Sequence, residues 1–161
     1  MDKQGIWKYD ITPLFRDGEA FSNVIKDLIK LITKEFDFVA GLDSLGYILG
    51  AAIANKLGKG FVPIRSKGKI PLTEDKILRK NFVDYSKKEK ALEIRKDSVN
   101  EGDRILIVDD VLETGTQVNS TVELIEQLEG KVTQIIAVTI DSEKINKELV
   151  ERYDCTALNL R

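Results

Sequence analysis

The chain has no histidine among its 161 residues. That absence excludes Ser-His-Asp and Cys-His catalytic triads, zinc sites built on histidine, and an imidazole general base. The single cysteine, Cys155, cannot form an intrachain disulfide, and it predicts a reducing compartment. Any chemistry must therefore use carboxylates, Lys, Arg, Tyr, backbone amides or a metal ion held by oxygen atoms.

The sequence also lacks an apolar run of the roughly 20 residues that a membrane-spanning helix needs. The longest candidate, residues 48–54, is far too short, and the first ten residues lack the apolar core of a signal peptide. No excess of one charge is present, since 25 Lys and Arg residues nearly balance 27 Asp and Glu residues. Bulk nucleic-acid binding needs a basic surface. We therefore expect a cytoplasmic protein with no membrane partner and no nucleic-acid partner.

The length and the hydrophobic pattern predict a single α/β domain over residues 1–161. Short apolar runs that suit buried strands alternate with segments whose apolar residues recur at helical spacing. Such alternation indicates a mostly parallel twisted sheet flanked by helices. Pro63 predicts an edge or a strand start at its position. The expected strands are 38–42, 61–64, 92–94, 104–108, 135–140 and 157–158, and the expected helices are 20–32, 47–57, 118–128 and 143–153.

Residues 66–90 interrupt this alternation. The segment is polar, rich in lysine, and carries only isolated apolar residues. A connection of this length inside a small domain is commonly a binding loop or a lid. We therefore predict a flexible lid over residues 66–90, which is mobile without ligand and ordered with it.

Three turns after predicted strands are candidates for a ligand site, because ligands of open α/β sheets bind beyond the carboxyl ends of the strands. These turns are residues 43–46, 65–69 and 109–117. The third joins Asp109 and Asp110 to a loop with Gly and Thr at a helix start, where N–H groups and the helix dipole favour phosphate. The two carboxylates could hold hydroxyl groups, or a Mg²⁺ ion shared with a second phosphate. The alternative is that the Asp pair only ends a strand and that Thr114 only caps the helix.

Residues 105–116, ILIVDDVLETGT, resemble the phosphoribosyl pyrophosphate signature of type I phosphoribosyltransferases. Three further segments are similar to motifs of the adenine branch of that family. They are DITPLF at 10–15, FVAGLDSLGYILG at 38–50 and FVPIRSKGKIP at 61–71. The four motifs are collinear over most of the chain. The resemblance implies the type I phosphoribosyltransferase fold, with a flexible hood loop at the lid segment.

The resemblance also implies a function. The expected reaction converts adenine and phosphoribosyl pyrophosphate to AMP and pyrophosphate with Mg²⁺, in purine salvage, and the expected assembly is a homodimer. Backbone amides and the Thr114 hydroxyl would hold the 5-phosphate in the loop formed by Glu113, Thr114, Gly115, Thr116 and Gln117. Asp109 and Asp110 would engage the ribose hydroxyls and are the candidate protein ligands of a Mg²⁺ ion that is held mainly by pyrophosphate.

The remaining site roles follow from the same resemblance. The pyrophosphate would lie against the loop of Ser44, Leu45 and Gly46 and against the side chains of Arg65 and Lys69. The purine pocket would include Ile6, Trp7 and Tyr9. The candidate catalytic residues are Arg65, Lys69 and Asp84, with Asp84 as the proton carrier for the purine ring.

Several positions depart from the family pattern. Leu45 stands where the family usually has Arg, and Glu113 and Gln117 stand where it usually has Ala and Thr. Glu113 places a carboxylate close to the expected phosphate. These departures leave two alternatives open, namely a hypoxanthine or guanine phosphoribosyltransferase and a non-catalytic nucleotide-sensing paralogue.

Overall fold

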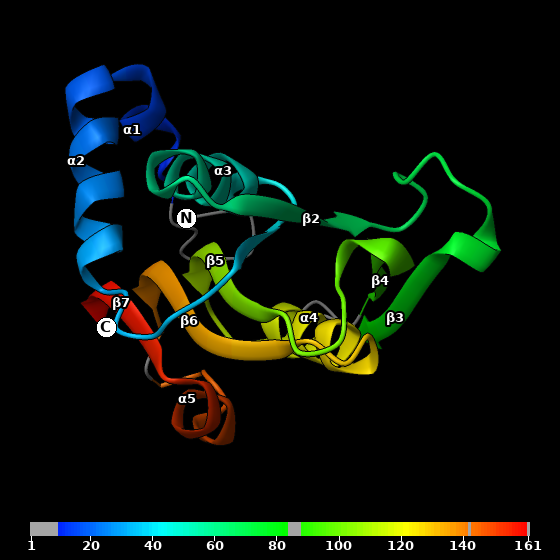
Figure 1. The fold of residues 1–161 in the computed structure, drawn as a ribbon. Helices are drawn as coiled ribbons and strands as arrows, with labels where there is room; N and C mark the ends of the chain where they lie inside the picture. Colours follow the sequence, from blue (N-terminus) through cyan, green and yellow to red (C-terminus); the bar gives the residue numbers. More distant parts are fainter. Residues whose placement is uncertain (1–9, 84–87, 142, 161) are drawn as a thin grey trace.

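The structure is a computed structural model, and it describes residues 10–83, 88–141 and 143–160. Within these residues a seven-stranded sheet has the order β3-β4-β2-β1-β5-β6-β7 (Figure 1). Strands β2, β1, β5, β6 and β7 are parallel, whereas β4 runs antiparallel to both β2 and β3. The strands are β1 (Phe38–Leu42), β2 (Gly60–Ser66), β3 (Ile77–Val83), β4 (Glu89–Arg95), β5 (Arg104–Leu112), β6 (Lys131–Ile140) and β7 (Cys155–Leu160).

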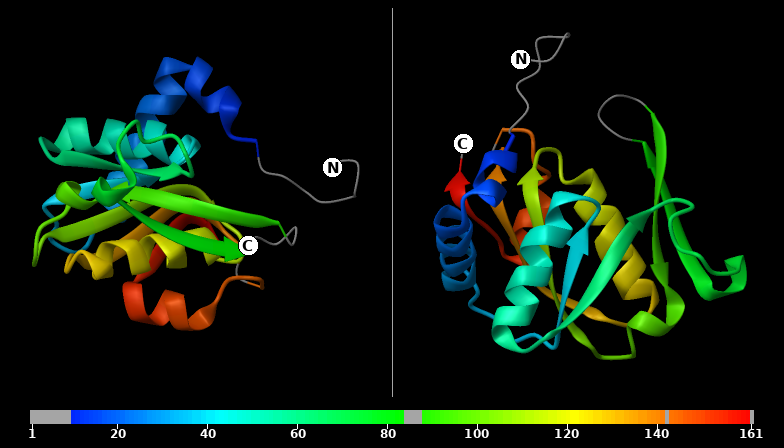
Figure 2. Two further views of the ribbon diagram at one scale, coloured as in Figure 1. Left: turned by 90° about the vertical axis from the view of Figure 1, so that its right-hand side faces the viewer. Right: turned by 90° about the horizontal axis from the view of Figure 1, so that it is seen from above.

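Helices cover both faces of this sheet (Figures 1 and 2). Helices α2 and α3 pack on one face, while α4 and α5 pack on the other. Alternation along β5 serves both faces, since Leu106 points toward α2 and α3 and Ile107 toward α4 and α5. The helices are α1 (Thr12–Arg16), α2 (Gly18–Lys30), α3 (Leu45–Leu57), α4 (Thr116–Gln127) and α5 (Lys147–Tyr153), with 3-10 turns η1 (Glu74–Lys76) and η2 (Lys96–Ser98). The α/β prediction is confirmed.

Local signals account for the ends of the predicted helices. The Asp17 carboxylate accepts hydrogen bonds from the amides of Glu19 and Ala20 and so caps the start of α2. Gly58 ends α3 in the left-handed conformation, at φ 64°, as its position after the last apolar residue predicts. Among the described residues no helix is both long enough and apolar enough to cross a membrane.

Two sequence predictions of irregular structure are wrong. Residues 77–83 and 89–90, inside the predicted lid, belong to the β3–β4 hairpin. The pattern failed there because β3 is an edge strand with mostly half-exposed or exposed residues, so it needs little apolar alternation. Asp109–Leu112, predicted as the start of a loop, continues β5, because pairing with β6 extends to Leu112 opposite Ile140.

The position of Pro63 in its strand and the start of α5 also differ from the predictions. Pro63 lies in β2, inside the sheet, but the described pairing of β2 with β4 is confined to Arg65 and Ser66. The missing N–H of Pro63 therefore costs no hydrogen bond to β4. Helix α5 begins at Lys147 rather than at residue 143, because Asn146 caps it by accepting a hydrogen bond from the amide of Glu148.

The topology creates a switch point between β1 and β5. The chain leaves β1 through α3 to reach β2 on one side, whereas β5 lies on the other side of β1. The right-hand view of Figure 2 shows the parallel strands pointing toward one edge of the sheet. Ligands of open α/β sheets bind at such a point, beyond the carboxyl ends of the strands. The turns after β1 and β5 are therefore the place to look for a site.

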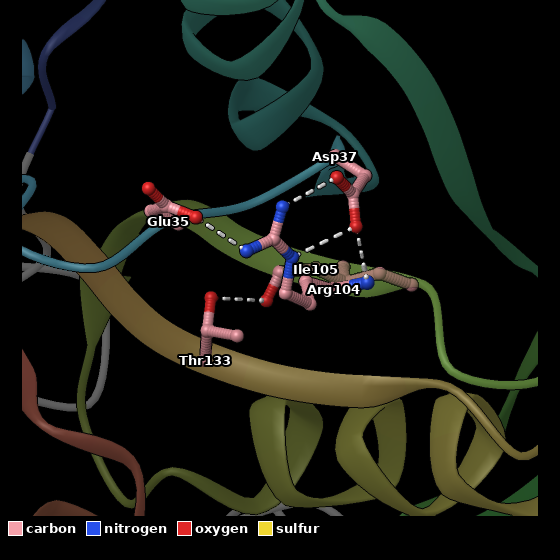
Figure 3. A network of polar contacts seen from close by, with 5 residues as sticks. All are labelled: Glu35, Asp37, Arg104, Ile105 and Thr133. Carbon is pink, nitrogen blue, oxygen red and sulfur yellow. Dashed lines mark hydrogen bonds and ion pairs between the residues drawn. The ribbon is translucent and has the colours of Figure 1, made fainter.

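At the amino ends of the parallel strands, away from the turns that follow β1 and β5, lies an ion-pair network around Arg104 (Figure 3). The guanidinium donates to both carboxylate oxygens of Asp37, at 3.1 and 2.9 Å, and to Glu35 at 2.6 Å. The Arg104 amide also donates to Asp37, at 3.0 Å. The network thus joins the residues before β1 to the start of β5. Hydrogen bonds from Arg104 lower the pKa of Asp37 from 3.8 to about 2.

We expect Asp37→Asn to lower the urea midpoint of unfolding at neutral pH. A carboxyl whose pKa is lower in the folded state contributes stability above its unfolded pKa and loses it as pH falls. The difference from wild type should therefore narrow between pH 3.8 and about 2. Asp27→Asn, which removes an exposed pair with Lys30 on α2, is the matched control and should change little. A difference that stayed constant with pH would contradict this role for Asp37.

Candidate active site

The turn that follows β1 meets the turn that follows β2 through Asp43. The Nζ of Lys69 lies 2.7 Å from Asp43 Oδ2, and the amide of Ser66 donates to the same oxygen at 3.3 Å. Burial raises the pKa of Asp43, but the hydrogen bonds from Lys69 and Ser66 outweigh it, so the pKa lies below its usual value. Asp43 is therefore an anion that holds the Lys69 ammonium at the carboxyl end of β1.

Close packing joins the first turn of α3 to β5. A Cβ atom on Gly46 would lie 2.9 Å from the carbonyl oxygen of Val108 and 3.0 Å from Asp109 Oδ1. Such distances leave no room for a side chain, so only glycine lets the start of α3 lie this close to β5. Gly46 thus brings the turn of Ser44 and Leu45 next to the carboxylate of Asp109.

Asp109 and Asp110 form a pair of adjacent carboxylates inside β5. The amide of Asp110 donates to Asp109 Oδ1 at 2.9 Å. Burial and then repulsion by the Asp110 carboxylate raise the pKa of Asp109 well above its usual value. A carboxyl in this environment is stabilised by a hydroxyl donor or a cation placed beside it.

The loop between β5 and α4 is short and tightly turned. Gly115 has φ 77° and begins α4, and a Cβ there would lie 2.8 Å from Leu149 Cδ2. The hydroxyl oxygens of Thr114 and Thr116 lie 2.9 Å apart, and the amide of Thr116 donates to the Thr114 hydroxyl at 3.4 Å. Asn146 donates its amide to the carbonyl of Thr114 at 3.4 Å. The loop thus presents two hydroxyl groups beside the amides of a helix start, which suits an anion.

The carboxylate of Glu113 in this loop is paired. Lys144, in the connection between β6 and α5, lies 3.2 Å from Glu113 and 3.0 Å from Asp141. Hydrogen bonds to Asp141 and then to Glu113 raise the pKa of Lys144. The negative charge that the sequence places beside the expected phosphate is therefore balanced by a lysine 31 residues later.

Arg65 completes the cationic side of the site. It lies in β2 beside Tyr47, whose hydroxyl donates to the carbonyl of Ile64 at 2.7 Å. Burial raises the pKa of Tyr47 to about 12, so the phenol stays neutral. Among the described residues the buried Nε of Arg65 has no hydrogen-bond partner. Arg65 thus adds a second cation, besides Lys69, next to the turn after β1.

Known proteins of similar sequence and structure agree with this geometry. The family model described as phosphoribosyl transferase domain matches residues 15–159. Adenine phosphoribosyltransferase from Thermotoga sp. (strain RQ2) is 38% identical over 157 residues, which cover 97% of this chain and 90% of that protein. The chain belongs to the phosphoribosyl transferase family. Among solved phosphoribosyltransferases, the adenine enzyme of Thermoanaerobacter pseudethanolicus has a TM-score of 0.90 at 37% identity, covering 98% of this chain and 90% of that chain.

A second solved phosphoribosyltransferase shows a ligand. The Saccharomyces cerevisiae adenine phosphoribosyltransferase, complexed with an iminoaltritol bisphosphate and adenine, has a TM-score of 0.76 at 29% identity. That match covers 98% of this chain and 86% of the yeast chain. The family and fold predicted from the sequence motifs are thus confirmed.

The structure brings most of the predicted phosphoribosyltransferase site residues to one edge of the sheet. Gly46 lies close against Asp109, and Lys69 is bonded to Asp43, the residue before Ser44. Ile6, Trp7, Tyr9 and Asp84 lie outside the described residues. Their predicted roles, the purine pocket and the proton carrier, stay predictions. The ligand contacts predicted for the remaining residues, from Ser44 to Gln117, also stay predictions.

Sequence reasoning missed three side chains that shape this edge. Asp43 belongs to a predicted ligand turn, but the sequence predicts no role for its side chain, although it lies directly beyond a buried strand. Lys144 gave no signal, because its partner Glu113 is distant in the sequence. Glu93 sits in an alternating segment, which predicts an exposed polar side chain, yet it is fully buried. Its contacts with Gly68 and Arg79 explain that position.

Proposed function

We propose that this chain transfers the phosphoribosyl group of phosphoribosyl pyrophosphate to adenine and releases AMP and pyrophosphate. The observation that carries the proposal is that the turn after β1 and the loop after β5 follow neighbouring parallel strands at the switch point of the sheet. The Thr114 loop suits a phosphate, and the Gly46 turn with Lys69 suits a pyrophosphate. The names of the relatives and the adenine in the yeast structure support adenine as the base.

The chemistry suits these residues. Breaking the anomeric bond develops positive charge on the ribose and negative charge on the departing pyrophosphate. Asp109 and Asp110 would accept hydrogen bonds from the ribose hydroxyls and favour the positive charge on the ring. Lys69 and Arg65 would bind the pyrophosphate oxygens and favour the negative charge. Catalysis in this proposal consists of positioning and electrostatic stabilisation, which need no histidine.

The donor atoms at this edge fit a Mg²⁺ ion that the substrate brings. Asp109 and Asp110 offer carboxylate oxygens, the ligands that Mg²⁺ prefers. Within residues 10–83, 88–141 and 143–160 no group of three or more Cys, Asp or Glu side chains is arranged to hold a metal. Mg²⁺ commonly keeps phosphate and water ligands beside one or two carboxylates. When bound there, the ion would neutralise part of the pyrophosphate charge.

One assay tests the proposal. The purified chain is incubated with Mg²⁺, phosphoribosyl pyrophosphate and one purine base at a time, and nucleotide formation is followed. Formation of AMP from adenine is the expected result. Formation of only IMP or GMP would support the hypoxanthine or guanine alternative. Binding of AMP without turnover of any base would support the nucleotide-sensing alternative. Light scattering on the same sample tests the proposed homodimer.

We propose that only part of the predicted lid, the turn at 67–73, closes over a ligand. Strand β3 of the hairpin is tied to α4, because Lys80 pairs with Glu123, and the two ends of the hairpin are joined where Lys96 donates to the carbonyl of Asp75. The turn at 67–73 is irregular and mostly exposed. We expect limited proteolysis within 67–73 to slow when phosphoribosyl pyrophosphate and Mg²⁺ are added. Equal cleavage with and without ligand would remove this turn from the closing segment.

The Glu113–Lys144 ion pair predicts in which direction each substitution changes the affinity for AMP. We expect Lys144→Ala to weaken AMP binding by roughly fivefold, because Glu113 then faces the phosphate unbalanced. In a chain that already carries Glu113→Ala, the same lysine substitution should have little effect on the dissociation constant for AMP. Glu113→Ala alone should tighten AMP binding modestly. Titration calorimetry on the four proteins measures the coupling, and additive effects would contradict it.

A further inference from the structure

Glu93, in β4, is the one charged residue among the described part of the chain whose side chain is fully buried. Its carboxylate accepts a hydrogen bond from the amide of Gly68 at 2.9 Å and another from Arg79 Nε at 2.7 Å. A second guanidinium nitrogen of Arg79 lies 2.7 Å from the same carboxylate. Glu93 therefore joins two places, the turn after β2 and the edge strand β3.

The turn that Glu93 holds is the one that carries Lys69. The amide of Lys67 donates to the carbonyl of Ala91 at 3.0 Å, and the amide of Ser66 donates to Asp43. Gly68 has φ 78°, so this turn adopts a conformation that most residues avoid. The bond from Gly68 to Glu93 fixes the turn at this residue, between the ties to Ala91 and to Asp43.

The three strands place a row of charges across the hairpin. Arg65 of β2 is opposite Glu93 of β4, and Glu93 is opposite Arg79 of β3. The described hydrogen bonds of the Glu93 carboxylate go to Gly68 and Arg79, while the buried Nε of Arg65 has no partner among the described residues. Arg65 is thus a neighbour of Glu93 in the sheet that is not among the described hydrogen-bond donors to its carboxylate.

The pair joins the fully buried Glu93 carboxylate to Arg79, whose side chain is 26% exposed and also pairs with Glu74. Removing the carboxylate from water is costly, and apolar residues of similar volume often stabilise a protein as well or better. The Glu93 carboxylate accepts a hydrogen bond from the turn that carries Lys69. Because the pair is a weak source of stability, its place beside this turn indicates that Glu93 holds the turn in position. This inference rests on the proposed function, in which Lys69 and Arg65 meet the pyrophosphate.

We propose that Glu93 is a positioning residue for the pyrophosphate end of the site. It holds the turn of residues 66–69 so that Lys69 and Arg65 present their charges to the pyrophosphate, and it couples that turn to the β3–β4 hairpin through Arg79. It does not touch the substrate, and it leaves the 5-phosphate end of the site unaffected.

The decisive variant replaces the pair by apolar residues, Glu93→Met together with Arg79→Met. We expect an unchanged or higher melting temperature, because the carboxylate of Glu93 no longer has to be buried away from water. The KM for phosphoribosyl pyrophosphate and the calorimetric dissociation constant for magnesium pyrophosphate should both rise roughly tenfold. The dissociation constant for AMP should stay at the wild-type value, because AMP carries the 5-phosphate and no pyrophosphate. Glu93→Gln keeps a carbonyl acceptor for the Gly68 amide and should recover part of the pyrophosphate affinity.

Asp97→Asn is the matched control, because it removes a carboxylate that pairs with Arg95 at the exposed end of β4. It should leave all three constants unchanged. Pyrophosphate affinity equal to wild type in the double variant, or an equal loss of AMP and pyrophosphate affinity, would overturn the proposal. If the double variant does not fold, Glu93→Gln with Arg79→Gln provides the same comparison. Absence of turnover in the wild type would refute the proposed function instead, and the two binding constants would still test Glu93.

Discussion

Thr114→Val is expected to weaken the binding of AMP and of phosphoribosyl pyrophosphate by roughly 10- to 150-fold. Valine keeps the shape of threonine and removes the hydroxyl, which lies 2.9 Å from the Thr116 hydroxyl in the loop before α4. Losing a hydrogen bond to a charged group typically costs about 1.5–3 kcal/mol. Both ligands carry the 5-phosphate, so both should weaken, while adenine alone should bind as before. Titration calorimetry with each ligand gives the comparison.

Thr133→Val is the control for this experiment. Its hydroxyl donates to the carbonyl of Ile105 at 3.4 Å, near the amino end of β5, so the variant loses a threonine hydroxyl contact without touching the loop. AMP affinity in this variant should match the wild type. If Thr114→Val also bound AMP normally, the phosphate would have to lie elsewhere.

Gly46→Ala is expected to lower kcat/KM for phosphoribosyl pyrophosphate by roughly 100-fold. The added methyl group would lie 2.9 Å from the carbonyl oxygen of Val108, which is backbone of a central strand. Strand β5 is paired on both sides and cannot yield, so the start of α3 must move away from Asp109. A misplacement of about 1 Å can cost a factor of 100 in rate. The assay of AMP formation measures the loss.

Folding should survive this substitution, because alanine is a better helix former than glycine by about 1 kcal/mol. Gly50→Ala, one turn further along α3, is the control. Its methyl group would meet the ring of Phe61 at 2.9 Å, and a side chain can turn aside where backbone cannot. Its kcat/KM should stay close to the wild-type value. A Gly46→Ala enzyme of normal activity would show that the turn after β1 has no fixed relation to Asp109.

Local patterns predicted the elements whose stability is local. The strand at 38–42 and the helix that Gly58 ends were both predicted because apolar spacing and a helix stop agree there. The extension of β5 through Asp109 was not predicted. Two adjacent carboxylates look like a turn in the sequence, and only the pairing with β6 keeps them in a strand.

The candidate site likewise has parts that the sequence predicts and parts that it does not. The sequence motifs predicted the turn of Gly46 and the loop of Thr114, because each needs particular residues next to one another. The side chains that hold these loops in place were not predicted. Lys144 pairs with Glu113 across the fold as well as with Asp141 in its own turn, and the described partners of Glu93 all lie in other segments. Their roles depend on pairs of distant residues, which a single sequence does not display.

The Arg104–Asp37 network lies at the amino ends of the strands, and the loops of the candidate site lie at the carboxyl ends. This separation has a consequence for engineering the protein toward heat resistance. Further ion pairs or better packing around Asp37 would add stability at the amino ends of the strands, far from the loops of the candidate site. Stability and turnover, which often compete when changes fall near an active site, could then be adjusted independently in this domain.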